Sequence, residues 1–168
     1  MLTLPVDYSE KLATVERVDL HRYVGKWYTI ASFPQLIAPL AHNTIVEYKL
    51  TNKGNLKVSK SFKSISRIVE DIILHGTAFI QENSNNAKLR IQYLWPFTDT
   101  SWVIDLADDY SYTVLSNPAR TSLTILSRNL KMDSAIYSAI LDRIKNMGFN
   151  IERLRLNPEF KKDLGSRD

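Results

Sequence analysis

Asn55-Leu-Lys-Val-Ser-Lys-Ser-Phe62 follows a turn sequence, Asn52-Lys53-Gly54, and places Leu56 and Val58 two residues apart, with polar side chains between them. A period of two residues is typical of a β-strand that has one buried face. The stretch is therefore predicted to be a strand. The same period dominates the chain from Gly25 to Arg128.

Seven further runs share this period and are separated by turn residues, including Glu82-Asn-Ser-Asn-Asn86 and Asn117-Pro118. Consecutive strands with short connections favour an antiparallel meander, and closing the meander into a barrel removes both exposed edges. We therefore expect an all-β fold, an eight-stranded antiparallel up-and-down β-barrel. The predicted strands are Lys26–Phe33, Asn43–Leu50, Asn55–Phe62, Val69–Ile80, Lys88–Leu94, Trp102–Leu106, Tyr112–Ser116 and Ser122–Ser127.

One C-terminal α-helix is predicted after the eighth strand. Asp133 is a suitable N-cap, and Gly148 is a suitable residue just past the helix end. Apolar residues between Met132 and Met147 form a single stripe, which predicts that the helix flanks the barrel and packs against its outside. A helix face that binds a partner is the alternative interpretation of this stripe.

The expected domain covers residues 15–156, with an N-terminal extension at 1–14 and a polar C-terminal tail at 157–168. Residues Ile151–Leu154 are expected to add a last edge strand, and the tail is expected to fray. No run approaches the roughly 20 apolar residues of a transmembrane helix. The first residues carry charges and a proline where a signal peptide needs an apolar core. Either the protein stays in the cytoplasm, or the sequence begins after a removed export segment.

The composition describes one packed domain of 168 residues, 44% apolar, with a net charge of +4. That charge is too small to predict a nucleic-acid-binding protein, and the basic residues are scattered among acidic ones. It does suit an anionic ligand or surface. The absence of cysteine excludes disulfides, thiolate nucleophiles and cysteine-ligated metals.

Catalytic motifs are missing from the sequence. It contains no G-x-S-x-G elbow and no H-E-x-x-H zinc helix. His21, His42 and His75 have no metal-ligand spacing, and His75 alternates with Gly76, so it is expected to point outward. We therefore expect no enzyme activity, no metal site and no cofactor. A barrel with hydrolase-like activity on a lipid is the alternative.

The more apolar face of each strand is expected to point into the barrel. An interior of this size is either filled by side chains or holds one small ligand, and the pattern alone favours neither. Small residues such as Ala31 and Gly76 leave room for a cavity. The inward residues under this rule are Val46, Tyr48, Leu50, Leu56, Val58, Ile72, Leu74, Gly76, Ala78, Ile80, Leu89, Ile91, Tyr93, Trp102, Ile104 and Leu106.

Lys60 shares the inward face of Leu56 and Val58. An unpaired ammonium in an apolar cavity is costly, and an anionic ligand head group would relieve that cost. The alternative is that Lys60 lies near the rim and extends into water.

Two predicted loops are unusually apolar, and both lie at the same end of an up-and-down barrel. They suggest a lid, a rim that touches a membrane, or a dimer contact, so we expect a monomer or a homodimer. The apolar loop residues are Leu36, Ile37, Leu40, Trp95 and Phe97.

The segment Val18-Asp-Leu-His-Arg-Tyr-Val-Gly-Lys-Trp-Tyr-Thr-Ile-Ala31 resembles the opening signature of the lipocalins, and Thr124-Ile-Leu-Ser-Arg128 resembles the third signature of that family. The second signature, Thr-Asp-x-x-Tyr, is present only in part, with Tyr110 as its match. The resemblance extends from about Val15 to Leu154. It is strongest to the bacterial outer-membrane lipoprotein branch, which is similar to apolipoprotein D and the plant temperature-induced lipocalins.

The resemblance implies a calyx that binds, stores or transports a small hydrophobic ligand such as a fatty acid or lysophospholipid. It also implies a role in membrane lipid maintenance under stress, at the periplasmic face of the bacterial outer membrane. Gly25 and Trp27 would close the narrow end of the barrel, with the Arg128 guanidinium stacked on the indole. The cavity positions carried over are Val46, Val58, Lys60, Leu74, Ala78, Ile91, Tyr93, Trp102, Thr124 and Leu126, to which the alternation adds Tyr48 and Ile104.

Overall fold

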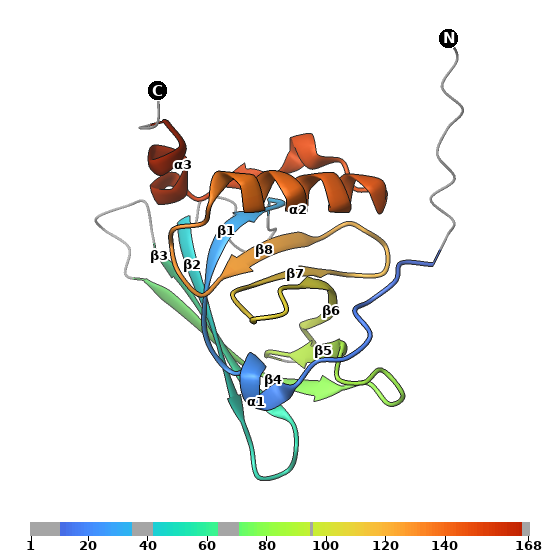
Figure 1. The fold of residues 1–168 in the computed structure, drawn as a ribbon. Helices are drawn as coiled ribbons and strands as arrows, with labels where there is room; N and C mark the ends of the chain where they lie inside the picture. Colours follow the sequence, from blue (N-terminus) through green and yellow to red (C-terminus); the bar gives the residue numbers. More distant parts are fainter. Residues whose placement is uncertain (1–10, 35–41, 64–70, 95, 166–168) are drawn as a thin grey trace.

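The computed structural model describes residues 11–34, 42–63, 71–94 and 96–165. Each strand pairs antiparallel with the next, and β1 pairs with both β2 and β8, so eight strands close into an up-and-down barrel (Figure 1). The fold predicted from the two-residue period is confirmed. The barrel strands are β1 (Gly25–Ser32), β2 (His42–Leu50), β3 (Leu56–Lys63), β4 (Ile72–Ile80), β5 (Lys88–Gln92), β6 (Thr98–Leu106), β7 (Tyr112–Ser116) and β8 (Leu123–Ser127).

A short helix, α1 (Leu20–Tyr23), precedes the first strand at one end of the barrel (Figure 1). The Asp19 carboxylate accepts a hydrogen bond from the His21 amide and caps this helix. The chain before it is bonded to the barrel, because the Val15 amide donates to the Val103 carbonyl at 2.9 Å. Tyr23 and Trp27 are completely buried, so this end of the barrel is closed by side chains.

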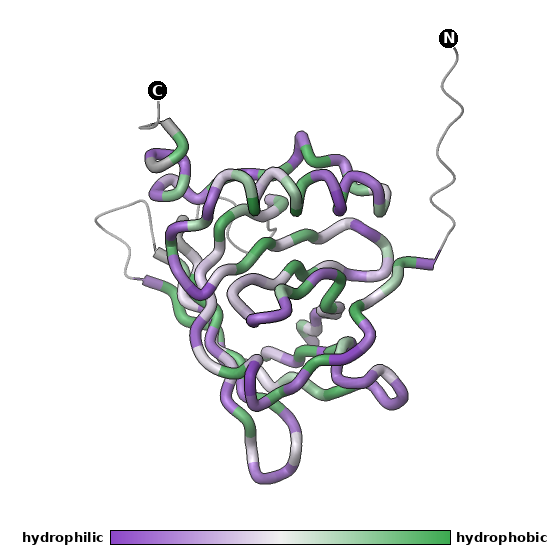
Figure 2. The backbone as a smooth tube through the Cα atoms, viewed as in Figure 1, coloured by the Kyte–Doolittle hydropathy of each residue, from purple (hydrophilic) through white to green (hydrophobic). Residues whose placement is uncertain are grey.

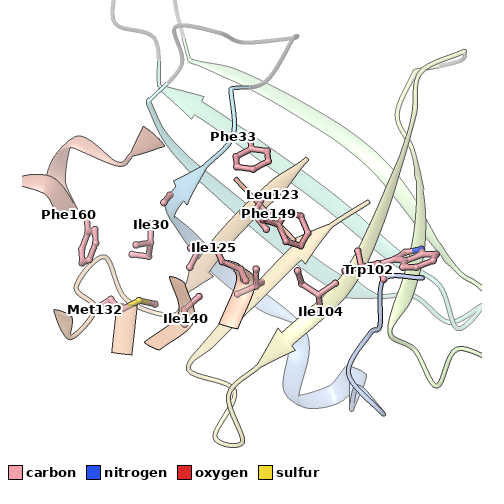
Figure 3. Packing of buried hydrophobic residues seen from close by; sticks show 14 residues of the cluster. Ile30, Phe33, Trp102, Ile104, Leu123, Ile125, Met132, Ile140, Phe149 and Phe160 are labelled. Carbon is pink, nitrogen blue, oxygen red and sulfur yellow. The ribbon is translucent and has the colours of Figure 1, made fainter. Parts of the chain in front are cut away.

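Helix α2 (Ser134–Asn146) lies across the outside of the barrel over β1 and β8 (Figure 1). Asp133 is its N-cap, as predicted, and accepts hydrogen bonds from the amides of Ala135 and Ile136. Buried Ile140 and Ile144 pack with outward residues of the strands, including Ile125 of β8 (Figure 3). The part of the apolar stripe formed by Ile140 and Ile144 is therefore covered by the protein's own barrel, whereas Ile136 remains 43% exposed. No described helix is both long and apolar enough to cross a membrane.

The C-terminal region differs from the prediction. Residues Ile151–Arg153 form a 3₁₀ turn, η1, rather than a strand, and the added edge strand is β9 (Arg155–Leu156), which pairs with β1. Helix α3 (Pro158–Gly165) follows instead of a frayed tail. Phe160 explains why this helix forms, since its side chain is 1% exposed and stacks edge-on against the Tyr137 ring.

The side chains alternate along the strands, and Figure 2 shows this as hydrophilic (purple) and hydrophobic (green) residues following one another along the tube. Two separate apolar clusters result from this alternation. The inner cluster lies inside the barrel and includes Trp27, Val46 and Leu126. The outer cluster lies between the barrel and the C-terminal helices (Figure 3), and it also takes in Leu12 from the predicted N-terminal extension.

Candidate functional site

A cavity of 620 Å³ opens inside the barrel. It lies toward the end formed by the connections between β1 and β2, β5 and β6, and β7 and β8, opposite to Trp27. The lining residues are Thr29, Phe33, Pro34, Thr44, Val46, Tyr48, Lys60, Phe62, Leu74, Ile91, Tyr93, Phe97, Thr98, Asp99, Thr100, Ser101, Leu115, Ser116, Thr121, Ser122, Leu123, Thr124, Leu126 and Arg153.

The wall of the cavity is divided by polarity. Buried Val46, Tyr48 and Leu126 belong to the inner cluster, which continues down to the closed end. Hydroxyl and charged side chains gather where β6 begins and in the connection before β8, at the open end. The cavity therefore presents an apolar interior and a polar mouth.

Lys60 and Asp99 form an ion pair on this wall. The Lys60 Nζ atom lies 3.7 Å from Asp99 Oδ2, and the two side chains are 17% and 44% exposed. The ammonium is therefore paired within the protein, an arrangement that neither interpretation of Lys60 included. The pairing was not foreseen because Asp99 lies in a segment that the sequence pattern did not assign to a strand, although β6 begins at Thr98.

Tyr93 lies beside this ion pair, with the Lys60 ammonium 5.4 Å from the centroid of its ring. The Tyr93 Oη atom is buried and has no hydrogen-bond partner among the described residues. Burial raises the pKa of this phenol, and the positive charge of Lys60 acts in the opposite direction. A neutral, unpaired hydroxyl next to a cation can donate to or accept from a polar group of a ligand.

Gly76, on the neighbouring strand β4, leaves room for the Tyr93 ring. A Cβ atom at position 76 would lie 2.8 Å from Tyr93 Cδ1 and 2.9 Å from the Gln92 carbonyl oxygen. The absence of a side chain at Gly76 was expected to enlarge the cavity. Instead, the aromatic ring occupies that space.

Most residues predicted to line the cavity do lie on its wall. These are Val46, Tyr48, Lys60, Leu74, Ile91, Tyr93, Thr124 and Leu126. Val58 and Ala78 are buried in the inner cluster but do not contact the cavity.

Trp102 and Ile104 point the other way, and the prediction that they line the cavity is wrong. Both belong to the outer cluster, where Figure 3 shows them, while Ser101 lines the cavity and Val103 belongs to the inner cluster. The more apolar face of β6 points outward, where it packs in the outer cluster together with residues of the C-terminal helices and with Leu12 of the N-terminal segment. The assumption that the apolar face points inward fails for a strand that is covered on both sides.

Several wall residues were not predicted, notably Phe62, Asp99, Leu115 and Arg153. Phe62 continues the inward alternation of β3, and extending that alternation would have predicted it. Arg153 could not have been predicted in this way, because it lies on η1, outside the barrel strands.

The closed end agrees with what the resemblance implied. The Arg128 guanidinium lies 3.7 Å from the centroid of the Trp27 ring, and Gly25 has a φ of +102°. A Cβ atom at Gly25 would lie 3.2 Å from Arg128 Nη1, so the glycine serves both the backbone conformation and the approach of the guanidinium.

The turn that carries the incomplete second signature is stabilised by other contacts. The Tyr110 hydroxyl accepts a hydrogen bond from the Asp19 amide at 2.8 Å, and the Arg22 guanidinium lies 4.1 Å from the centroid of the Tyr110 ring. The Asp109 carboxylate accepts from the Ser111 amide within the turn. These contacts attach the turn between β6 and β7 to α1.

At the open end, Phe97 is 61% exposed, as expected for a rim residue, and Leu94 is 78% exposed. Ile72 and Ile73, at the start of the adjacent strand β4, are 47% and 55% exposed. We call these four residues the apolar rim. The other predicted rim residues, Leu36, Ile37, Leu40 and Trp95, lie outside the described residues.

His75 points outward, as predicted, and its Nδ1 atom lies 3.2 Å from Ser59 Oγ on the exposed face of β3 and β4. This contact is separated from the cavity by the sheet. Within the described ranges, no group of His, Asp and Glu side chains is arranged to hold a metal ion.

The closed barrel, the flanking helix and the lined cavity together define a calyx-type binding protein. A family model described as a lipocalin-like domain matches residues 18–159. The chain belongs to the lipocalin family.

Similar proteins come from plants and bacteria. Temperature-induced lipocalin-1 of Arabidopsis thaliana is 27% identical, with 89% of this chain and 84% of that protein covered. The outer membrane lipoprotein Blc of Vibrio cholerae is also 27% identical, with 86% and 85% covered. Among solved structures, insecticyanin of Manduca sexta superposes with a TM-score of 0.69 at 19% identity, covering 87% of this chain and 83% of its own. The family and these relatives support the binding of a small hydrophobic ligand.

Proposed function

We propose that this protein binds one elongated amphiphile, a fatty acid or a lysophospholipid, in the cavity and stores or carries it. The supporting observation is the division of the cavity wall into an apolar interior and a polar mouth. Its volume of 620 Å³ lies within the range of small-molecule sites, roughly 300–1,000 Å³.

Burial of the hydrocarbon chain would supply most of the affinity. Transfer of a chain from water contributes about 0.8 kcal/mol per methylene group. Association and ordering of the ligand oppose this gain. A long acyl chain therefore retains enough net free energy for micromolar binding, a Kd that corresponds to about −8 kcal/mol.

The polar end of the ligand would lie against Lys60 and Tyr93. In this proposal the Lys60 ammonium orients the head group, and the Tyr93 hydroxyl gains the hydrogen-bond partner that it lacks among the described residues. Since Asp99 is paired with Lys60, the carboxylate also discriminates among head groups.

We propose further that the ligand is drawn from a membrane and that the apolar rim contacts the bilayer surface. Two observations support this proposal. The rim side chains are exposed, and Phe97 also lines the cavity mouth, so the rim and the ligand site are continuous. In addition, some relatives are named outer membrane lipoproteins.

The direct experiment is a fluorescence titration of delipidated protein with N-phenyl-1-naphthylamine, a neutral apolar probe, followed by displacement with laurate and with a lysophospholipid. An added probe is used because, of the two tryptophans that the structure describes, Trp102 lies on the outer face of the barrel and Trp27 is stacked at the closed end. Saturable probe binding with displacement by either lipid is expected.

A pair of variants locates the site. Thr124→Trp places an indole in the cavity and should abolish probe binding, whereas Thr77→Trp places one on the outer face of β4 and should leave binding unchanged. Unchanged titrations in both variants, with the fold intact by circular dichroism, would show that the cavity is not the binding site.

A further inference from the structure

The charges on the cavity wall do not balance. Among the described lining residues, Lys60 and Arg153 are cations and Asp99 is the single anion. Lys60 is paired with Asp99 at 3.7 Å. Within the same described residues, no carboxylate lies within ion-pair distance of Arg153. The excess positive charge of the wall is therefore located at Arg153.

Arg153 reaches the cavity from outside the barrel. It is the last residue of η1, the turn between α2 and β9, and this turn is fixed at its start by the Asn150 side chain, which accepts from the Glu152 amide. The next residue along, Leu154, donates its amide to the Ile151 carbonyl at 3.1 Å. The backbone that carries Arg153 is therefore defined by local hydrogen bonds.

The Arg153 side chain is held against an aromatic wall residue. Its guanidinium carbon lies 4.7 Å from the centroid of the Phe33 ring, and Phe33 is 3% exposed. Phe33 is fixed in turn by the Phe149 ring at 6.4 Å and by its own amide, which donates to the Leu123 carbonyl. A guanidinium stacked on a ring keeps its charge and leaves its N–H groups directed along its edge.

We propose that Arg153 is the residue that selects an anionic ligand, by donating to a carboxylate or phosphate at the cavity mouth. This inference rests on the proposed function, because the chain of the same ligand would occupy the cavity. A planar guanidinium matches both anions, since it can donate two parallel hydrogen bonds to their oxygens. Lys60 and Asp99 then form a polar contact that carries no net charge.

The test compares anionic ligands with neutral ligands that have the same chain. Displacement of N-phenyl-1-naphthylamine is measured with laurate against 1-dodecanol, and with lysophosphatidate against the matching monoacylglycerol. In the unmodified protein each anion should bind more tightly than its neutral match. In Arg153→Gln this preference should fall about tenfold, the size of one charge-assisted contact at a partly exposed site. The two anion arms show whether the carboxylate or the phosphate is preferred.

Matched variants separate a contact from a change of net charge. Arg155→Gln removes the same charge from an exposed residue of β9 that does not line the cavity, and it should leave the preference intact. Arg153→Lys keeps the charge and should restore part of the preference. The effect of Arg153→Gln should also weaken as salt is raised.

The outcomes that overturn this inference differ from those that overturn the proposed function. If the neutral probe fails to bind the unmodified protein, the cavity function itself is wrong. If the probe binds normally, but Arg153→Gln weakens anions and neutral matches equally or acts no differently from Arg155→Gln, Arg153 does not select the anion. Probe binding by Arg153→Gln shows that the variant is folded.

Discussion

Arg128 closes the barrel by contacting two different kinds of group at once. Its guanidinium lies 3.7 Å from the centroid of the Trp27 ring, and its Nη1 and Nη2 atoms donate to the carbonyls of Lys26, Arg22, Tyr23 and Val24. These carbonyls belong to α1 and the start of β1, so one side chain connects β8 to the segment that enters the barrel.

Replacing Arg128 with alanine should therefore lower stability without changing ligand selectivity. The variant loses a stacked cation and leaves carbonyl groups without their donor, which together cost about 3 kcal/mol. For a domain of this size the melting temperature should fall by about 10 °C. Arg90→Ala is the control, because Arg90 lies 5.1 Å from the centroid of the exposed Phe79 ring. A selective loss of probe binding in folded Arg128→Ala would contradict this structural role.

Gly76→Ala should disturb the cavity wall even though it adds only one methyl group. The new Cβ atom would lie 2.8 Å from Tyr93 Cδ1, so the ring must move. We expect a loss of about 1–3 kcal/mol in urea unfolding, typical of overpacking, together with weaker probe binding.

A double-mutant cycle with Tyr93→Ala tests the cause. Removal of the ring should relieve part of the cost of Gly76→Ala, and the rest should persist because the Gln92 carbonyl lies 2.9 Å from the same Cβ position. Strictly additive effects would show that the ring is not the group that is displaced.

The barrel itself could be predicted because its signal is local and repeated. Alternation in the stretch around Leu56 and Val58 recurs along the chain, and a closed meander is the arrangement that removes every edge. The flanking helix was equally clear, since its cap at Asp133 and its stripe lie within one continuous segment.

The candidate site was only partly predictable, for two physical reasons. Trp102 and Ile104 were assigned to the wrong face because β6 has an apolar outer side, which packs with residues that are distant in sequence, from Leu12 to the C-terminal helices. Asp99 and Arg153 were missed because their significance depends on tertiary contacts, with Lys60 in one case and Phe33 in the other.

Asp99→Asn should raise the affinity for laurate. The substitution removes the carboxylate that is paired with Lys60 at 3.7 Å and leaves an uncompensated ammonium on the cavity wall. Affinity for laurate should increase several-fold, whereas affinity for 1-dodecanol should hardly change, because only the charged ligand interacts with the freed ammonium. Displacement titrations at low salt measure both values.

Lys60→Met provides the reciprocal measurement. This variant leaves Asp99 unpaired, so laurate should bind more weakly, and the double variant with Asp99→Asn should recover toward the unmodified protein. If the ratio of the affinities for laurate and for 1-dodecanol is the same in every variant as in the unmodified protein, the pair does not contact the head group.

The apolar rim offers a test of membrane contact that does not depend on the ligand. Leu94 and Phe97 are 78% and 61% exposed at the open end of the barrel, so Leu94→Asp and Phe97→Asp should each weaken sedimentation with vesicles of phosphatidylethanolamine and phosphatidylglycerol. The loss should be about tenfold per variant, because a carboxylate replaces an apolar side chain that would otherwise enter the interface. Ile136→Asp makes the same chemical change at a residue of α2 that is 43% exposed and distant from the mouth, and it should sediment like the unmodified protein. If all three variants lose vesicle binding equally, net charge governs the interaction, and the rim is not the surface that contacts the bilayer.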